Sequence, residues 1–254
     1  MYPQKSWIGG CFVSKISKKE LLLLIKSWVL NKKKGSYITA INVSKLVMMQ
    51  KDRKLADCIL RSSINIADGA PILLATKLLG NPVSERISGV ELMEELLKLA
   101  SENRFKVYFL GAKQEILSKV IDRCTLQFPS LKIVGRHHGF FTKDREDSLV
   151  REIASRSPDI LFIALGLPQK EYFIVDHCDK LNTSVILAVG GGFDIYSGIK
   201  PRAPHWVQNM GIEWLWRSIY DRSRAKLVYI NFLPFIKIIL QEMFKQRILR
   251  GREG

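Results

Sequence analysis

The feature that most constrains this chain is a repeated alternation between short apolar runs and longer segments with helical periodicity. Continuous apolar runs, typical of buried strands, lie at 36–42, 64–67, 105–111, 131–135, 158–166 and 184–192. Strands that are apolar on both sides and separated by helices form parallel sheets covered on both faces. We therefore predict an α/β fold built on a parallel sheet with helices on both faces.

The intervening segments carry signals for helix boundaries. Ser17 and Glu20 have capping-box spacing before a helix to about residue 30, and Ser88 and Glu91 repeat it before a helix to about 102. Further helices are predicted at 43–60, 70–79, 112–128, 144–156, 169–181, 204–224 and 235–250. The last two have no strand between them. We therefore predict an α/β core over 1–200 and a basic, amphipathic helical appendage over 201–254.

The 254-residue chain has a net charge of +16, and this charge lies at its two ends. Residues 1–61 hold 13 Lys and Arg against 3 Asp and Glu, and residues 198–254 hold 11 against 4. The segment between them holds 16 against 17. Basic ends around a neutral middle favour an anionic partner such as a membrane surface, a phosphorylated substrate or a nucleic acid.

Other features of the sequence argue against a disulfide-rich, a metal-binding, a secreted or a membrane-spanning protein. The four cysteines form no CxxC pair, and no metal-ligand spacing is present, so we expect reduced thiols, a cytoplasmic protein and no metal. The N-terminus lacks a signal-peptide pattern. The longest apolar segment, 227–240, is interrupted by Asn231, Pro234 and Lys237, so we do not expect it to cross a bilayer.

Polar residues follow several of the predicted strands, where open α/β sheets bind ligands. Asp68 ends the run at 64–67 and precedes Gly69. It can cap the next helix or act as a general base, with Gly69 allowing a substrate close to the backbone. Both roles remain open from the residues alone.

Three other segments also have two interpretations. The glycine-rich turn at 190–192 can supply amides to a phosphate, or be a tight turn. Arg86 suits a phosphate or carboxylate, but a lone Arg more often forms a surface ion pair. The segment at 211–224, rich in Trp and Arg, fits either a core helix with a basic outer face or a helix at a membrane edge.

Five segments, read in order, resemble the WecG/TagA/CpsF family of bacterial glycosyltransferases. The resemblance covers about residues 37–224, and its last segment is long and specific. The segments are NIADGAPILLATKLLG (65–80), ERISGVEL (85–92), HHGFF (137–141), PDILFIALGLPQKEYFI (158–174) and AVGGGFDIYSGIKPRAPHWVQNMGIEWLWR (188–217).

The resemblance implies a Rossmann-like core and an inverting transfer from a UDP-sugar without a metal or other cofactor. The donor is expected to be UDP-N-acetylmannosamine, its uronic acid or another UDP-hexose. The implied acceptor is an undecaprenyl-diphosphate-linked saccharide at the inner face of the cytoplasmic membrane, in the synthesis of teichoic acid or another surface polysaccharide. It also implies peripheral membrane association through the appendage, and a homo-oligomer remains open.

The resemblance also assigns roles to residues. It implies that Asp68 is the catalytic base and that Asn42, Arg86 and Lys170 lie beside it. The expected UDP-sugar contacts are Gly69, Gly111, Gly139, Phe140, Gly166, Glu171, Gly190, Gly191, Gly192, Phe193 and Asp194. The residues expected to contact lipid diphosphate or membrane are Arg202, Arg217, Arg222 and Arg224.

Two positions depart from the family pattern. Ala40 stands where Thr is common, and Lys170 stands where Gln is common in the P-x-Q-E motif. Lys170 could meet a donor carboxylate or phosphate, so we hypothesise a donor other than plain UDP-N-acetylmannosamine. The alternatives are a non-catalytic UDP-binding scaffold, a nucleic-acid-binding protein, which lacks any recognisable motif here, and a nicotinamide-dependent oxidoreductase, which the missing GxGxxG disfavours.

Overall fold

The structure is a computed structural model that describes residues 2–204, 206–207, 210–213, 216, 219 and 222–250. Its strands are β1 (Lys5–Ile8), β2 (Cys11–Ser14), β3 (Ser36–Ile41), β4 (Ile64–Ala67), β5 (Lys106–Gly111), β6 (Lys132–His137), β7 (Ile160–Ala164) and β8 (Val185–Ala188). Its helices are α1 (Lys18–Leu30), α2 (Val43–Met49), α3 (Arg53–Leu60), α4 (Ala70–Leu78), α5 (Gly89–Asn103), α6 (Gln114–Gln127), η1 (Lys143–Arg145), α7 (Glu146–Arg156), α8 (Gln169–His177), α9 (Gly192–Tyr196) and α12 (Arg222–Arg250).

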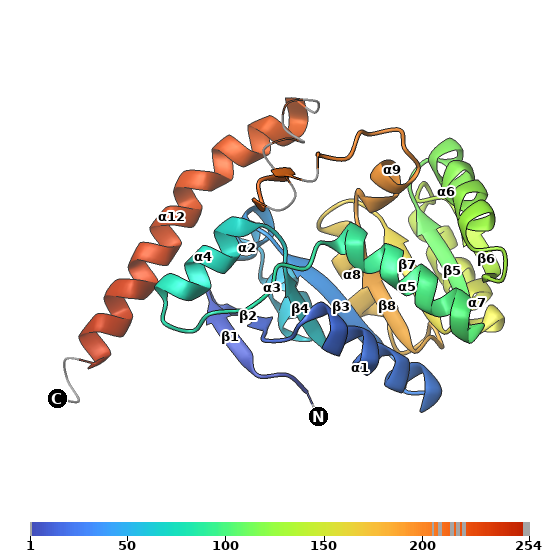
Figure 1. Cartoon of the computed structure of the whole chain (residues 1–254), viewed down its shortest axis with the longest axis horizontal. Coiled ribbons are helices and arrows are strands. Elements are labelled where there is room, and N and C mark those ends of the chain that lie inside the picture. Colours follow the sequence, from blue (N-terminus) through green and yellow to red (C-terminus); the bar gives the residue numbers. More distant parts are fainter. Residues whose placement is uncertain are drawn as a thin grey trace.

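The centre of the molecule is a six-stranded sheet with the order β4-β3-β8-β7-β5-β6 (Figure 1). Every pair of neighbours is parallel, as the apolar runs predict. The chain moves outward through β3 and β4, crosses to β5 and β6, and returns through β7 and β8 to the centre. The carboxyl ends of all six strands therefore lie along one edge, which is where the site is expected.

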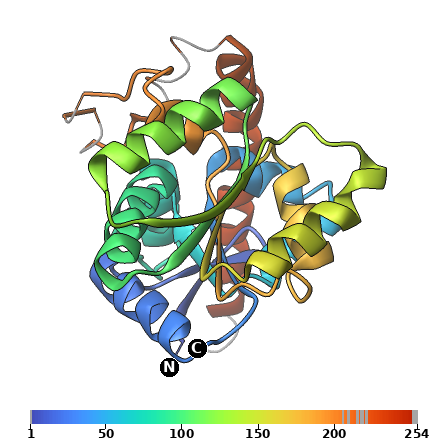
Figure 2. The same cartoon turned by 90° about the vertical axis from the view of Figure 1, so that its right-hand side faces the viewer.

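Helices cover both faces of the sheet (Figure 2). Alternate side chains of the strands belong to the apolar clusters of these two helix layers. Phe109 and Phe162 face the layer of α1, α5, α6 and α9, and their rings stack with centroids 5.4 Å apart. Tyr108 and Leu161 face α7 and α8 on the opposite side. This period of two, with both faces buried, confirms the predicted covering of the sheet.

A third apolar cluster joins the N-terminal hairpin to the C-terminal helix. Strands β1 and β2 pair antiparallel across Gly9 and Gly10, which have φ of +53° and +79°. Ile8 of this hairpin belongs to the same buried cluster as Phe235 and Ile239 of α12. The sequence interpretation did not identify the hairpin, because its strands are only four residues long and the short apolar pattern of each is ambiguous.

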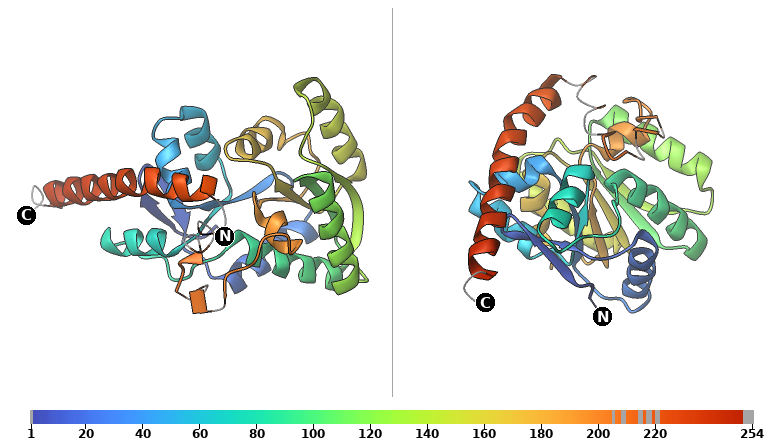
Figure 3. Two further views of the ribbon diagram at one scale, coloured as in Figure 1. Left: turned by 90° about the horizontal axis from the view of Figure 1, so that it is seen from above. Right: turned by 60° about the vertical axis from the view of Figure 1, so that its left-hand side comes forward.

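Helix α12 corrects the prediction of a helix starting at 235. It is a single helix of 29 residues that contains Pro234. Figures 1 and 3 show it running along one side of the molecule and projecting past the sheet. Within the described residues, no helix combines the length and the apolar character needed to cross a membrane.

Several predicted helix boundaries are also corrected. The helix predicted at 43–60 is two helices, because Asp52 caps α3 by accepting a hydrogen bond from the Leu55 amide. The capping box of Ser17 and Glu20 is confirmed. Ser88 is the N-cap of α5 but makes no side-chain capping bond, so that predicted box is wrong. Helix α8 ends at His177, short of the predicted 181.

Candidate active site

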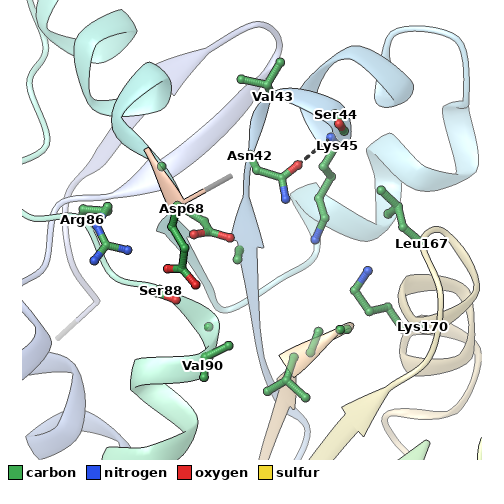
Figure 4. Close-up of a pocket in the computed structure, with 18 of the residues that line it drawn as sticks. Asn42, Val43, Ser44, Lys45, Asp68, Arg86, Ser88, Val90, Leu167 and Lys170 are labelled. Carbon is green, nitrogen blue, oxygen red and sulfur yellow. Dashed lines mark hydrogen bonds between the residues drawn. The ribbon is translucent and has the colours of Figure 1, made fainter. Parts of the chain in front are cut away.

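A pocket of about 350 Å³ opens where β3, β4, β7 and β8 end. Asp68 and Arg86 lie on one side of it, and Lys45 and Lys170 lie on the other (Figure 4). The pocket brings together eight of the residues predicted from the sequence: Asn42, Asp68, Gly69, Arg86, Gly166, Lys170, Gly190 and Gly191. The predicted role of each in binding or catalysis remains a prediction.

Asp68 is held at the pocket by the end of the sheet. Its amide donates to the carbonyl of Ile41 at 2.9 Å, which continues the ladder between β3 and β4 by one residue. Gly69 follows with a φ of +103°, a conformation that favours glycine, and it is the N-cap of α4. The N-cap position is therefore taken by Gly69 and not by Asp68.

Asn42 is both a helix cap and a pocket residue. Its Oδ1 accepts a hydrogen bond from the Lys45 amide at 3.0 Å and so caps α2. This bond fixes the side-chain amide, and Figure 4 shows Nδ2 on the pocket side. Asn42 can therefore offer a donor to a hydroxyl or phosphate oxygen without losing its capping bond.

In the pocket wall, two lysines contact one carboxylate that is buried behind them. Lys45 Nζ lies 2.7 Å and Lys170 Nζ lies 3.0 Å from Glu171 Oε1. The three side chains are 3%, 9% and 0% exposed, respectively. Lys45 also donates to Thr39 Oγ1 on β3. Figure 4 shows the two ammonium groups converging at the pocket, and we call these three residues the Lys45–Glu171–Lys170 triad.

Mutual electrostatics set the charges of this triad. Burial disfavours the Glu171 carboxylate, but the two ammonium groups outweigh that effect and hold its pKa below the ordinary value. Burial and repulsion by Lys45 lower the pKa of Lys170 to about 8, against the attraction of Glu171. When all three groups are ionised, the triad carries one positive charge that Glu171 does not balance.

Arg86 is oriented by a carboxylate of α5. Arg86 Nη2 donates to Glu91 Oε1 at 2.9 Å, and Arg202 Nη2 lies 3.5 Å from the same oxygen. Arg202 Nη1 also donates to Glu94 at 2.9 Å. The ion pair predicted as the alternative for Arg86 therefore exists, and it places the arginine in the pocket wall. Arg202 is thus held against α5, and its predicted contact with lipid diphosphate or membrane stays a prediction.

The glycine-rich turn after β8 approaches the triad closely. Gly190 has a φ of +51°, and a Cβ there would lie 3.6 Å from Lys170 Cε. The Gly190 amide donates to Ile163 and the Gly192 amide donates to Val189, so both donors are used within the fold. The expected cradle of backbone amides for a phosphate thus has two fewer donors than the sequence suggests.

Residues after 200 complete the pocket. The Ala70 amide donates to the carbonyl of Gly211 at 3.1 Å, which fixes this segment to the start of α4 beside Asp68. Gly211 and Glu213 line the pocket together with Phe232, which belongs to α12, and Glu213 is buried. The wall therefore combines segments of the α/β core with residues after 200.

Other predicted residues lie outside the pocket wall. Gly111, Gly139, Phe140 and Asp194 follow or flank the carboxyl ends of β5, β6 and β8 but do not line the pocket. A Cβ at Gly111 would lie 2.4 Å from the Ala164 carbonyl oxygen, so close strand contact explains that glycine.

The remaining predicted residues are inside the fold or beyond the described part. Phe193 is fully buried, with its ring centroid 5.8 Å from that of Phe109, and Gly192 is buried beside it. Arg217 and the side chains of Arg222 and Arg224 lie outside the described residues.

Lys45, Glu213 and Phe232 are among the pocket residues that the sequence interpretation missed. Lys45 lies three residues after Asn42, in the first turn of a helix that starts at a strand end, so its position could have been recognised. Glu213 and Phe232 gave no comparable signal, since only tertiary packing brings their segments to the sheet edge.

The sequence was also compared with protein families and with characterised proteins. The model of the Glycosyl transferase WecG/TagA/CpsF family matches residues 7–249. An N-acetylglucosaminyldiphosphoundecaprenol N-acetyl-beta-D-mannosaminyltransferase from Bacillus subtilis (strain 168) is 30% identical over 197 residues, which is 78% of this chain and 76% of that protein. The protein of the same name from Staphylococcus aureus (strain NCTC 8325 / PS 47) is 31% identical over 187 residues, 74% of this chain and 71% of that protein.

Proposed function

The chain belongs to the WecG/TagA/CpsF family of glycosyl transferases, and we propose that it transfers a sugar from a UDP-sugar to an undecaprenyl-diphosphate-linked saccharide. The observation that carries this proposal is the position of Asp68 in a pocket that also holds Arg86, Lys45 and Lys170. A general base and several cations at one sheet edge suit the transfer of a sugar from a diphosphate.

In the proposed reaction, an acceptor hydroxyl oxygen attacks the anomeric carbon of the donor sugar. The Asp68 carboxylate takes the hydroxyl proton as the new bond forms. The bond from the anomeric carbon to the diphosphate oxygen breaks, and UDP leaves with its electron pair. Displacement in a single step inverts the anomeric centre.

The cations have a separate task in this scheme. The departing diphosphate gains negative charge, and a fixed positive charge in a pocket of low dielectric stabilises it more strongly than water would. Arg86, oriented by Glu91, supplies such a charge from one side of the pocket. We infer no metal in this step, and its absence stays a prediction.

We further propose that the acceptor reaches the pocket from the inner surface of a bacterial membrane. The relatives from Bacillus and Staphylococcus are named for transfer to a diphosphoundecaprenol-linked sugar. Helix α12 supports this proposal, because its outer side exposes Leu233, Leu240 and Phe244 while it also carries Lys237 and Lys245.

The first test is transfer from labelled UDP-sugars to lipid-linked N-acetylglucosamine. The full chain is compared with Asp68→Asn, which keeps the size of the side chain but cannot accept the proton. We expect Asp68→Asn to lose about 10²-fold or more in turnover while it retains UDP binding, the usual scale for loss of a general base.

Asp122→Asn, on the exposed side of α6, is the matched control and should behave as wild type. Near-normal transfer by Asp68→Asn would remove Asp68 as the base. UDP binding without transfer from any donor would favour the non-catalytic scaffold instead.

A further inference from the structure

The Lys45–Glu171–Lys170 triad is an unusual arrangement for the wall of a pocket. Lysines are seldom buried without a partner, because water no longer solvates the charge. Here two ammonium groups contact a single carboxylate oxygen, at 2.7 and 3.0 Å, and only Lys170 and Lys45 of the three residues line the pocket. One positive charge on the pocket side thus lacks a counter-charge within the triad.

The groups around the triad do not supply that counter-charge. Tyr37 of β3 lies beside Glu171, and burial keeps its pKa well above the ordinary value, so its hydroxyl stays neutral. Cys58 of α3 also faces Glu171, and burial raises the pKa of its thiol to about 11. Thr39 of β3 contributes a neutral hydroxyl to Lys45. Lys45 and Glu171 are the charged groups that shift the pKa of Lys170. Asp68, Arg86 and Glu213 also line the pocket that Lys170 faces.

We propose that Lys170, positioned by Glu171 and Lys45, is an oxyanion-binding residue that contacts the UDP-sugar in this pocket. This inference rests on the proposed function and assigns the donor's oxyanion to this side of the pocket. A substrate oxygen carrying negative charge would satisfy the unbalanced ammonium group, with a charge-assisted hydrogen bond as the contact. Gly190 lies beside this side chain, since a Cβ there would be in ordinary van der Waals contact with Lys170 Cε at 3.6 Å.

Two oxyanions of a UDP-sugar fit this chemistry: a phosphate oxygen of the diphosphate and, in a uronic acid donor, the sugar carboxylate. Both accept hydrogen bonds from an ammonium group. The experiment must therefore separate the two sources.

The test measures the binding of UDP, UDP-N-acetylglucosamine and UDP-glucuronate to the full chain by titration calorimetry between pH 7 and pH 9. The pKa of Lys170 is about 8, lowered mainly by burial, so the ammonium group is present below this pH and is lost above it. Affinity for the wild type should therefore fall as the pH rises through about 8, and bound ligand should move the midpoint upward.

Two substitutions of Lys170 are expected to differ in their affinity for the ligands at pH 7. Lys170→Gln removes the charge, so we expect affinity at pH 7 to drop about tenfold or more and its fall above pH 8 to disappear. Lys170→Arg keeps a charge throughout this range, so we expect binding to be retained and also to lose its fall above pH 8. A lysine with only a structural role would not show this pair of results.

A second variant moves the midpoint and leaves Lys170 in place. Glu171→Gln removes the carboxylate that favours the charged form of Lys170, so the pH midpoint for binding should shift downward. Lys54→Gln is the matched control, because Lys54 also pairs with a carboxylate, Asp176 at 2.8 Å, but lies exposed on α3 outside the pocket. It should bind all three ligands as wild type does.

Each outcome decides the inference. A loss shared by all three ligands in Lys170→Gln assigns the diphosphate to this site, whereas a loss confined to UDP-glucuronate assigns the sugar carboxylate. Equal affinity and equal pH dependence of wild type and Lys170→Gln for all ligands would overturn the inference and leave the proposed function intact. Failure of the wild type to bind any of the three would overturn both.

Discussion

At the scale of single residues, the site depends on backbone positions as much as on charged side chains. Gly69 and Gly211 meet at the start of α4, where the Ala70 amide donates to the Gly211 carbonyl. Gly211 has a φ of +70°, and a Cβ there would lie 2.8 Å from the Ala70 Cβ. The segment that carries Glu213 can therefore reach the pocket only through a residue without a side chain.

We predict that Gly211→Ala lowers transfer activity strongly while the fold is retained. The added methyl group must displace this segment from α4, which moves Glu213 from its position in the pocket wall. Steady-state transfer and thermal unfolding of the same samples measure the two effects.

Gly198→Ala separates the clash from backbone strain. Gly198 has a φ of +79°, but its Cβ would meet nothing within 4 Å. Both variants carry the cost of a positive φ, about 1–2 kcal/mol, and only Gly211→Ala carries the clash. Equal activity of the two variants would contradict a role for this close approach.

At the scale of elements, α12 has two different apolar sides. Phe235 and Ile239 are 6% and 5% exposed and pack with the hairpin and α2. Leu240 and Phe244 are 59% and 66% exposed on the other side. The inner side holds the helix to the core, and the outer side is available to a membrane surface.

We expect the double variant Leu240→Ser and Phe244→Ser to weaken binding to anionic vesicles about tenfold or more. Full burial of each side chain in a lipid interface contributes on the order of 1.5–3 kcal/mol, and partial insertion contributes less. Co-sedimentation with phosphatidylglycerol vesicles measures the change.

Leu126→Ser is the control for this prediction, because Leu126 is 83% exposed on α6. It should leave vesicle binding unchanged, and neither variant should alter the thermal unfolding temperature. Vesicle binding of the double variant at the wild-type level would rule out this side of α12 as the contact.

At the scale of the whole molecule, residues after 200 are part of the fold in the described chain. The predicted boundary near 200 separates sequence patterns, but Phe235 and Ile239 share a buried cluster with Ile8 and Leu46. Residues 211, 213 and 232 also line the pocket. The predicted core of 1–200 thus lacks part of its own apolar cover.

We predict that a chain ending at residue 200 unfolds at a lower temperature and has no transfer activity. Loss of Phe235 and Ile239 alone removes about 3–6 kcal/mol of hydrophobic stabilisation, at about 1.5–3 kcal/mol for each buried side chain. Differential scanning calorimetry of both chains measures the change. A truncated chain with unchanged stability would support an independent core.

The sequence by itself determined the parallel sheet, its two helix layers and the set of strand ends that carry Asn42, Asp68 and Lys170. These follow from local patterns, because continuous apolar runs and strand ends are encoded by neighbouring residues. Arg86 and Asp68 lie 18 positions apart and share one wall of the pocket, because the Ile87 amide donates to the Ala67 carbonyl at the end of β4 at 3.0 Å.

Only the tertiary structure decided which charges and surfaces meet. Lys45 and Glu171 are 126 positions apart, so no local pattern predicts that they share an ion pair with Lys170 at 2.7 and 3.0 Å. The same applies to Gly9, whose amide donates to Glu242 Oε2 at 2.6 Å and joins the two ends of the chain. Such contacts depend on strand order and helix packing, which arise from the burial of apolar surface throughout the chain.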